Sequence, residues 1–177
     1  MKLTSRQLTR AATIAALYAA LCFFLKPLCY GAIQLRISEV LCVLPIFMSE
    51  AIPGLFIGCL IANLLGGAFL IDVVLGSLTT LVAALLTRFI YKKTGNTPLS
   101  LFPPVILNAL IVGLYVPFVY SDPGTVNTLP VVLSSMLTVG IGQAIVIYLL
   151  GIPFSKAISK LSFEHFVNIF VKSLPCY

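Results

Sequence analysis

Long apolar runs constrain this chain more than any other feature of its sequence. Hydrophobic residues make up 60% of the chain and charged residues 9%, and the mean hydropathy is +1.12. A soluble globule needs a largely polar surface, which this composition does not provide. The sequence therefore predicts an integral membrane protein. No polar mature domain follows the apolar run at 11–25, so we interpret that run as a permanent span rather than a signal peptide.

Proline, glycine and charged residues divide the apolar runs into six candidate helices. Their ranges are about 10–25, 38–49, 52–70, 72–92, 101–120 and 129–151. The predicted fold class is an all-α membrane protein, a single domain over residues 1–177 built as a bundle of six transmembrane helices. The second and third candidates share about 33 residues, fewer than two full crossings of about 20 each. We therefore expect one of them to be short, tilted or broken at Pro45 or Pro53.

Basic residues predict the orientation of the spans. Cytoplasmic ends of spans are enriched in Lys and Arg, so the net charge of +6 indicates topology rather than a nucleic-acid partner. Both termini are then cytoplasmic, and residues from about 153 to 177 form an amphipathic cytoplasmic tail. The clusters on this side are Lys2, Arg6 and Arg10, then Arg88, Lys92 and Lys93, then Lys156, Lys160 and Lys172.

A polar segment at 30–39 lies on the opposite, outer side in this topology. It contains Gln34, Arg36 and Glu39 within six positions. Each ionisable group costs roughly 2.5–3.5 kcal/mol to insert toward lipid. In a chain this apolar, such groups therefore indicate a functional site. We expect a ligand to bind here, with contact between Arg36 and outer lipid headgroups as the alternative.

Few polar residues lie inside the predicted spans. These are Asn63, Asn108 and Gln143, with Tyr115 and Tyr148 nearby and Asp72 at the outer rim. Each carboxamide alone is explained by an interhelical hydrogen bond, worth about 0.6 kcal/mol on average. Together with Glu39 they would line one pocket that accepts a planar, hydrogen-bonding heterocycle.

Catalytic and metal-binding patterns are missing from the sequence. It contains no Gly-x-Ser-x-Gly, no His-Glu-x-x-His and no Walker-type Gly-x-x-x-x-Gly-Lys segment, and its single histidine, His165, follows the last span. The five cysteines include no Cys-x-x-Cys pair and are interpreted as small apolar residues. We predict a protein that is not an enzyme and that uses no cofactor or metal.

Two alanine rows mark the first helix. Ala11, Ala15 and Ala19 form one row, and Ala12, Ala16 and Ala20 form the next row around the helix. Small residues at this spacing let another helix approach closely. That helix belongs either to a partner subunit or to the protein's own bundle, and the spacing alone leaves both open. Glu50, between the second and third spans, is predicted to be a solvated helix terminus.

Three segments resemble the QueT family. They are Tyr30-Gly-Ala-Ile-Gln-Leu-Arg-Ile-Ser-Glu-Val-Leu41, the stretch from Ile52 to Asn63 with Gly66-Gly67, and Asp72-Val-Val-Leu-Gly-Ser77. The resemblance runs from the alanine-rich first helix to Gly151-Ile-Pro153. It implies the substrate-binding S component of an energy-coupling factor (ECF) transporter for queuosine precursors, in a bacterial cell membrane.

The resemblance also implies partners and sites. An S component binds its ligand near the outer face. Its first helix docks through an Ala-x-x-x-Ala pattern on a transmembrane coupling subunit. That subunit works with two cytoplasmic ATPases. Either alanine row matches that pattern. A 7-deazaguanine is the expected cargo, with Glu39 reading its Watson–Crick edge and Asp72 meeting an aminomethyl cation. The alternatives are an S component for another vitamin or nucleobase, a stand-alone channel or facilitator, and a scaffold without ligand.

Overall fold

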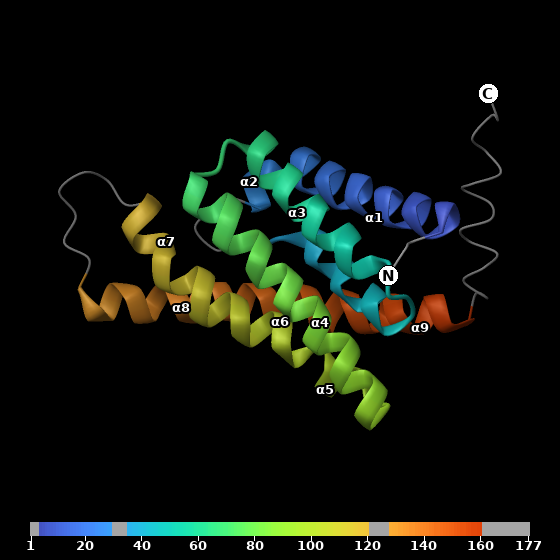
Figure 1. Ribbon diagram of the computed structural model, residues 1–177. Helices are drawn as coiled ribbons and strands as arrows, with labels where there is room; N and C mark the ends of the chain where they lie inside the picture. The colour runs from blue at the N-terminus through green and yellow to red at the C-terminus, as the bar shows by residue number, and fades with distance from the viewer. Residues whose placement is uncertain (1–3, 30–34, 121–127, 161–177) are drawn as a thin grey trace.

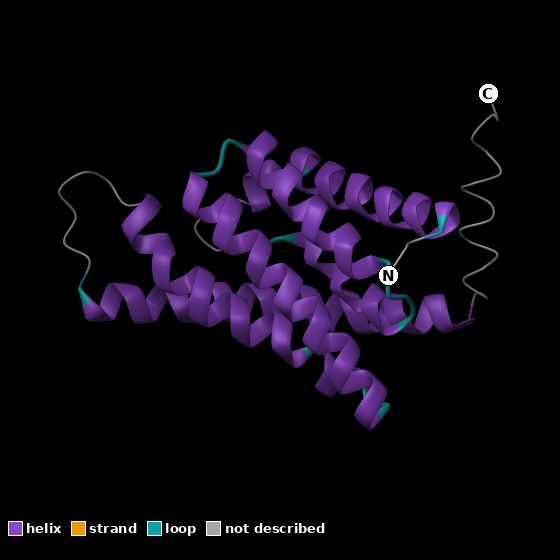
Figure 2. Ribbon diagram, viewed as in Figure 1, coloured by secondary structure: helices purple, strands orange, loops and turns teal. Residues whose placement is uncertain are grey.

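The computed structural model describes residues 4–29, 35–120 and 128–160, and all regular structure in these ranges is helical (Figures 1 and 2). Four helical stretches are long and apolar enough to cross a membrane, namely Ser5–Phe24, Asp72–Thr94, Thr97–Tyr120 and Leu129–Lys160. Two apolar helices are shorter, Ile37–Ile46 and Ala51–Gly66, at 10 and 16 residues. The prediction of an all-helical, multi-pass membrane protein is confirmed. The second and third predicted helices, which share too few residues for two full crossings, are both short.

The longer stretches are composed of several helical segments. In chain order the elements are α1 (Ser5–Phe24), α2 (Lys26–Cys29), η1 (Ile37–Ile46), α3 (Ala51–Gly66), η2 (Asp72–Gly76), α4 (Ser77–Thr94), α5 (Thr97–Ser100), α6 (Phe102–Leu107), η3 (Asn108–Val112), α7 (Gly113–Tyr120), α8 (Leu129–Ala144), η4 (Ile145–Gly151) and α9 (Ile152–Lys160). The segment η1 is a 3₁₀ helix with Pro45 inside it, whereas η2, η3 and η4 are π-helical turns. Such turns widen a helix locally and are frequent at functional sites.

Local sequence signals explain where several helices begin and end. Thr4 and Gln7 form a capping box at the start of α1, in which each side chain bonds the other residue's backbone N–H. Gly67 and Gly95 end α3 and α4 with φ angles of 73° and 64°, a left-handed conformation that glycine adopts without steric cost. Pro53 lies in the first turn of α3, where its missing N–H is not needed, so it does not break the helix.

The bundle has two distinct ends. At the α2 end, to the left in Figure 1, α1, α3 and α7 end while η2 and α8 begin. The starts and ends of these five elements thus lie toward the same side of the bundle. Toward the opposite side, to the right in Figure 1, α1 begins, α4 ends and α9 ends.

Small residues bring α1 and α3 into close contact. Gly54 and Gly58 form a Gly-x-x-x-Gly pair on α3. A Cβ atom on Gly58 would lie 3.0 Å from the Cα of Ala15, and one on Gly54 would lie 2.7 Å from the carbonyl oxygen of Ala11. Ala11, Ala15 and Ala19 are therefore buried inside the protein.

The structure shows which of the two alanine rows lies inside the protein. The row of Ala11, Ala15 and Ala19 packs within the chain, so it does not form the exposed docking row that the sequence also allowed. Ala12 and Ala16 in the neighbouring row face outward and are exposed.

Glu50 is not solvated, and that prediction is wrong. Its side chain is buried and forms an ion pair with Arg10, whose Nη1 lies 3.2 Å from Oε1 of Glu50. The pair ties the start of α1 to the turn between η1 and α3. Burial alone would raise the pKa of Glu50, but hydrogen bonds from its own backbone, Arg10 and Ser49 bring that pKa below its ordinary value.

The last helix continues past the predicted start of the tail. It runs through Pro153 to Lys160, and Ile158 in its final turns is buried in the main core. The remainder of the predicted amphipathic tail, residues 161–177, lies outside the described residues.

Replacing Gly58 with valine should destabilise the α1–α3 contact. The added Cβ would lie 2.8 Å from the Cβ of Tyr18. Overpacking of this kind typically costs about 1–3 kcal/mol, because the backbones must separate. Thermal unfolding in detergent, followed by circular dichroism, measures the effect, with Ala16→Val on the exposed face of α1 as the matched control. Equal midpoints for the two variants would show that α1 does not depend on this close approach.

Candidate functional site

An ion pair is buried at the α2 end of the bundle. Nη2 of Arg36 lies 3.5 Å from Oδ2 of Asp72, and the two side chains are 6% and 2% exposed. Arg36 immediately precedes η1, and Asp72 is the first residue of η2. The pair therefore joins two segments that are 36 residues apart in the sequence.

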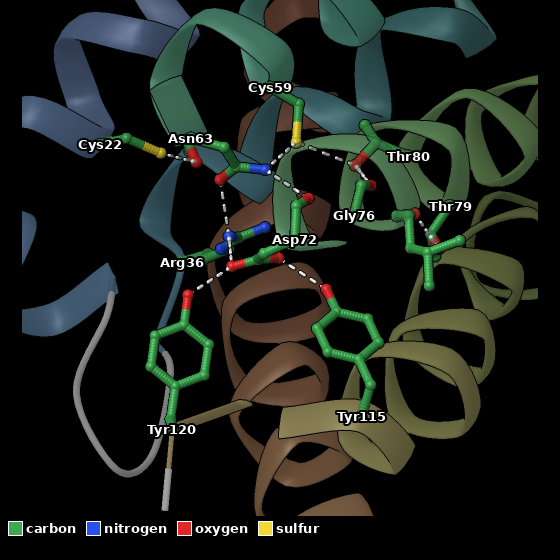
Figure 3. A network of polar contacts seen from close by, with 12 residues as sticks. Cys22, Arg36, Cys59, Asn63, Asp72, Gly76, Thr79, Thr80, Tyr115 and Tyr120 are labelled. Atoms are coloured by element: carbon green, nitrogen blue, oxygen red, sulfur yellow. Dashed lines mark hydrogen bonds and ion pairs between the residues drawn. The ribbon is translucent and has the colours of Figure 1, made fainter. Parts of the chain in front are cut away.

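Further polar side chains complete this arrangement, which Figure 3 shows from close by. Asn63, near the end of α3, accepts a hydrogen bond of 2.8 Å from Arg36 and donates one of 3.0 Å to the backbone carbonyl of Asp72. The hydroxyls of Tyr115 and Tyr120 on α7 donate to Oδ1 and Oδ2 of Asp72 at 2.6 and 2.9 Å. We call these five residues the Asp72 cluster.

Gly76 provides the space that the Asp72 cluster needs. A Cβ atom at this position would lie 2.8 Å from Oδ1 of Asp72 and 3.3 Å from Nδ2 of Asn63. Any larger residue would push the carboxylate away from Tyr115. The Asp-x-x-x-Gly spacing at 72–76 places this glycine about one helical turn after the carboxylate.

A second buried carboxylate lies nearby. Glu39 in η1 has no exposed surface, and its Oε1 accepts a 2.5 Å hydrogen bond from the hydroxyl of Tyr18 on α1. Its Oε2 accepts hydrogen bonds from the Cys42 thiol at 2.9 Å and from Nε2 of Gln143 on α8 at 3.1 Å. We call these four residues the Glu39 cluster. It ties η1 to both α1 and α8.

Cys59 on α3 connects the two clusters. Its sulfur accepts a hydrogen bond of 3.6 Å from Asn63 and one of 3.5 Å from Thr80, and it also interacts with Tyr18. The two clusters thus form one continuous polar region enclosed by apolar helices. A thiol suits this position because it is a weak hydrogen-bonding group that otherwise packs as a small apolar residue.

Most of the residues singled out in the sequence come together here. Arg36, Asn63, Asp72 and Tyr115 share the Asp72 cluster, and Glu39 and Gln143 share the Glu39 cluster. Asn108 is also buried but belongs to neither cluster. Its amide donates to the carbonyl of Pro104 in its own helical stretch. Tyr148 donates instead to the carbonyl of Pro98. Gln34 lies outside the described residues.

Sequence reasoning missed Tyr18, Tyr120 and the polar roles of Cys42 and Cys59. Tyr18 carried a usable signal, because a tyrosine inside an apolar helix needs a partner for its hydroxyl. Tyr120 is the last residue of the predicted fifth span, and its position gave no signal of a buried partner. Nothing in the sequence distinguished the two cysteines from small apolar residues that only fill the core.

The chemistry of this region suits binding rather than catalysis. It offers a guanidinium, two carboxylates, two carboxamides and tyrosine hydroxyls, which together supply both donors and acceptors. Among the described residues, no three His, Cys, Asp or Glu side chains are grouped so as to hold a metal ion. A polar heterocycle is the kind of molecule that this set of groups recognises.

Comparison with known proteins gives a family match. A family model described as "QueT transporter" matches residues 8–160. The curated "Queuosine precursor transporter QueT" of Lactococcus lactis subsp. cremoris (strain MG1363) is 41% identical over 73 residues. That alignment covers 40% of this chain and 43% of the relative, so less than half of the relative's length is matched. No solved structure matches the chain.

Replacing Asp72 with alanine should strongly destabilise the protein. The change leaves the Arg36 guanidinium buried without its carboxylate, and breaking a buried ion pair in this way costs about 3–5 kcal/mol. Unfolding in mixed detergent micelles measures the loss. The double replacement Arg36→Met with Asp72→Leu should lose less stability, because no charge is then left unpaired.

Asn108→Ala is the control for this experiment. Its buried amide bonds only a carbonyl of its own helical stretch, so we expect a loss of about 0.6 kcal/mol, the average for such bonds in membranes. Losses of equal size for Asp72→Ala and Asn108→Ala would contradict a stabilising role for the ion pair.

Proposed function

Because this chain belongs to the QueT transporter family, we propose that it is the membrane-embedded, substrate-binding S component of an ECF-type importer and that it captures a queuosine precursor. Family membership makes it a transport protein, and its apolar helices make it a multi-pass membrane protein. The name of the Lactococcus relative supports a queuosine precursor as the cargo. We propose a 7-deazaguanine, bound from the extracellular side.

The buried polar region at the α2 end carries this proposal. Charged side chains inside an apolar bundle are costly and mark ligand pathways or binding sites in membrane proteins. Arg36, Glu39 and Asp72 are all buried, and they converge from two separate segments of the chain. If these residues served only packing, apolar residues of similar volume would give equal or greater stability.

Binding in this region requires the helices at the α2 end to separate. The hydroxyl groups of Tyr115 and Tyr120 tie α7 to Asp72, and these hydrogen bonds from neutral donors break at lower cost than the Arg36–Asp72 ion pair. Movement of α7 away from η2 is therefore our proposed route of entry. The ligand is then enclosed away from water, which strengthens every polar contact that it makes.

Energy for uptake comes from partner subunits in this proposal. The sequence contains no Walker-type segment, so we assign ATP hydrolysis to two cytoplasmic ATPases that act through a coupling transmembrane subunit. We place the protein in a bacterial cell membrane, as the bacterial relative suggests, and the distribution of basic residues supports cytoplasmic termini. The α2 end is then the extracellular end.

The exposed alanine row on α1 is our proposed docking surface for the coupling subunit. Ala12 and Ala16 face outward, one turn apart, while the neighbouring row packs against α3. A face without side-chain bulk permits close approach of a partner helix.

The purified chain should bind a 7-deazaguanine without its partners. A subunit that captures a scarce nutrient needs high affinity, and we expect a nanomolar dissociation constant, which corresponds to about −12 kcal/mol. Isothermal titration calorimetry in detergent tests this, and mass spectrometry of co-purified small molecules identifies a retained ligand. Absence of binding for every 7-deazaguanine at millimolar concentration would contradict the proposed cargo.

Replacing Ala12 or Ala16 with tryptophan should prevent assembly with the coupling subunit. The bulky ring blocks close helix approach but lies away from both polar clusters, so ligand affinity should change by less than about twofold. Co-purification from cells that express the coupling subunit and the ATPases measures assembly.

Ala15→Trp is the contrasting variant. Its side chain would enter the α1–α3 contact, so we expect loss of folded protein rather than selective loss of assembly. Normal assembly of both Ala12→Trp and Ala16→Trp would exclude this face as the docking surface.

A further inference from the structure

We propose that the ligand binds as a cation, with the Glu39 carboxylate as its counter-charge, and that Asp72 does not serve this role because Arg36 already neutralises it. This inference rests on the proposed function and reverses the roles that the sequence suggested for the two carboxylates. It makes Glu39 the residue that determines specificity.

Glu39 is surrounded by neutral donors. Its three hydrogen-bond partners are a tyrosine hydroxyl, a thiol and a carboxamide. Among the residues that the structure describes, no cationic side chain forms an ion pair with Glu39. A carboxylate has about four lone-pair positions, so one acceptor position is left for a ligand N–H group.

Asp72 also receives three donors, but one of them is charged. Arg36 forms an ion pair with it, and Tyr115 and Tyr120 supply the other two bonds. Glu50, another buried carboxylate, is likewise paired with Arg10. Glu39 is therefore the buried carboxylate without a counter-charge in the described part of the chain.

The charge balance of the polar region points the same way. Arg36 contributes one positive charge, while Glu39 and Asp72 contribute two negative charges, which leaves a net charge of −1. Burying a charge without a partner is unfavourable, and a cationic group brought against Glu39 removes that cost when it binds. A neutral ligand can also donate a hydrogen bond to the carboxylate, but it leaves the net charge of the region at −1.

Two 7-deazaguanines differ in the charge of the group at the 7-position. The 7-aminomethyl form carries a protonated amine at neutral pH, and the 7-cyano form has a neutral nitrile at the same position. Both share the same ring edge. Their affinity ratio therefore isolates the contribution of the positive charge.

Calorimetry with both compounds tests the inference. The wild-type protein should bind the aminomethyl form roughly tenfold to hundredfold more tightly than the cyano form, the usual size of one charge-assisted hydrogen bond. Glu39→Gln should lose most of that ratio by weakening the aminomethyl form alone. Glu39→Asp keeps the charge and should keep a preference for the cation.

Control variants separate charge recognition from folding. Glu50→Gln removes a different buried carboxylate and should lower the melting temperature while leaving the affinity ratio unchanged. Asp72→Asn should weaken both ligands by a similar factor, so it too preserves the ratio. An unchanged ratio in Glu39→Gln, or loss of the ratio in Asp72→Asn, would overturn the assignment of Glu39.

The two proposals fail in different ways. Equal binding of both compounds to the wild-type protein overturns the charge inference and leaves the proposed function intact. Binding of neither compound overturns the proposed cargo itself.

Discussion

The ion pair between Arg36 and Asp72 holds the α2 end of the bundle together. Within an apolar surrounding, neither charge is stable without the other, so the segment before η1 must meet the start of η2. Asn63 bonds to both partners and thereby fixes the end of α3 against them. Gly76 leaves the carboxylate the space to receive the α7 tyrosines. Four separate parts of the chain are positioned by this one requirement.

Close packing and polar chemistry depend on each other through α1. The glycines of α3 allow α1 to approach until backbone atoms are almost in contact, and this places Tyr18 beside Gly58. From that position the hydroxyl of Tyr18 reaches Glu39, and the Tyr18 side chain also interacts with Cys59. Any change that separates the two helices would also withdraw the donor from Glu39. The small-residue contact thus supports the buried polar region as well as the fold.

Much of this arrangement could be predicted from the sequence, because lipid leaves buried polar groups few partners other than one another. That constraint predicted the meeting of Asn63 and Asp72 and the inclusion of Glu39 and Gln143. Which alanine row packs inside depended on α3, and its Gly-x-x-x-Gly pattern was a signal that went unused. Glu50 was misjudged because Arg10, its partner, lies 40 residues earlier. The π-helical turns at Asp72 and Asn108 depend on tertiary contacts that no local pattern encodes.

Two carboxylates in one buried region have different electrostatic roles because their neighbours differ. Asp72 faces a guanidinium, so its charge is already balanced and its bonds serve to hold helices together. Glu39 faces only neutral donors, which orient the carboxylate without balancing it. In a region closed to water, an unbalanced charge attracts an opposite charge more strongly than it would at a surface. The same burial that makes the Glu39 charge costly in the empty protein therefore favours a cationic ligand over a neutral one, since a cation balances that charge when it binds.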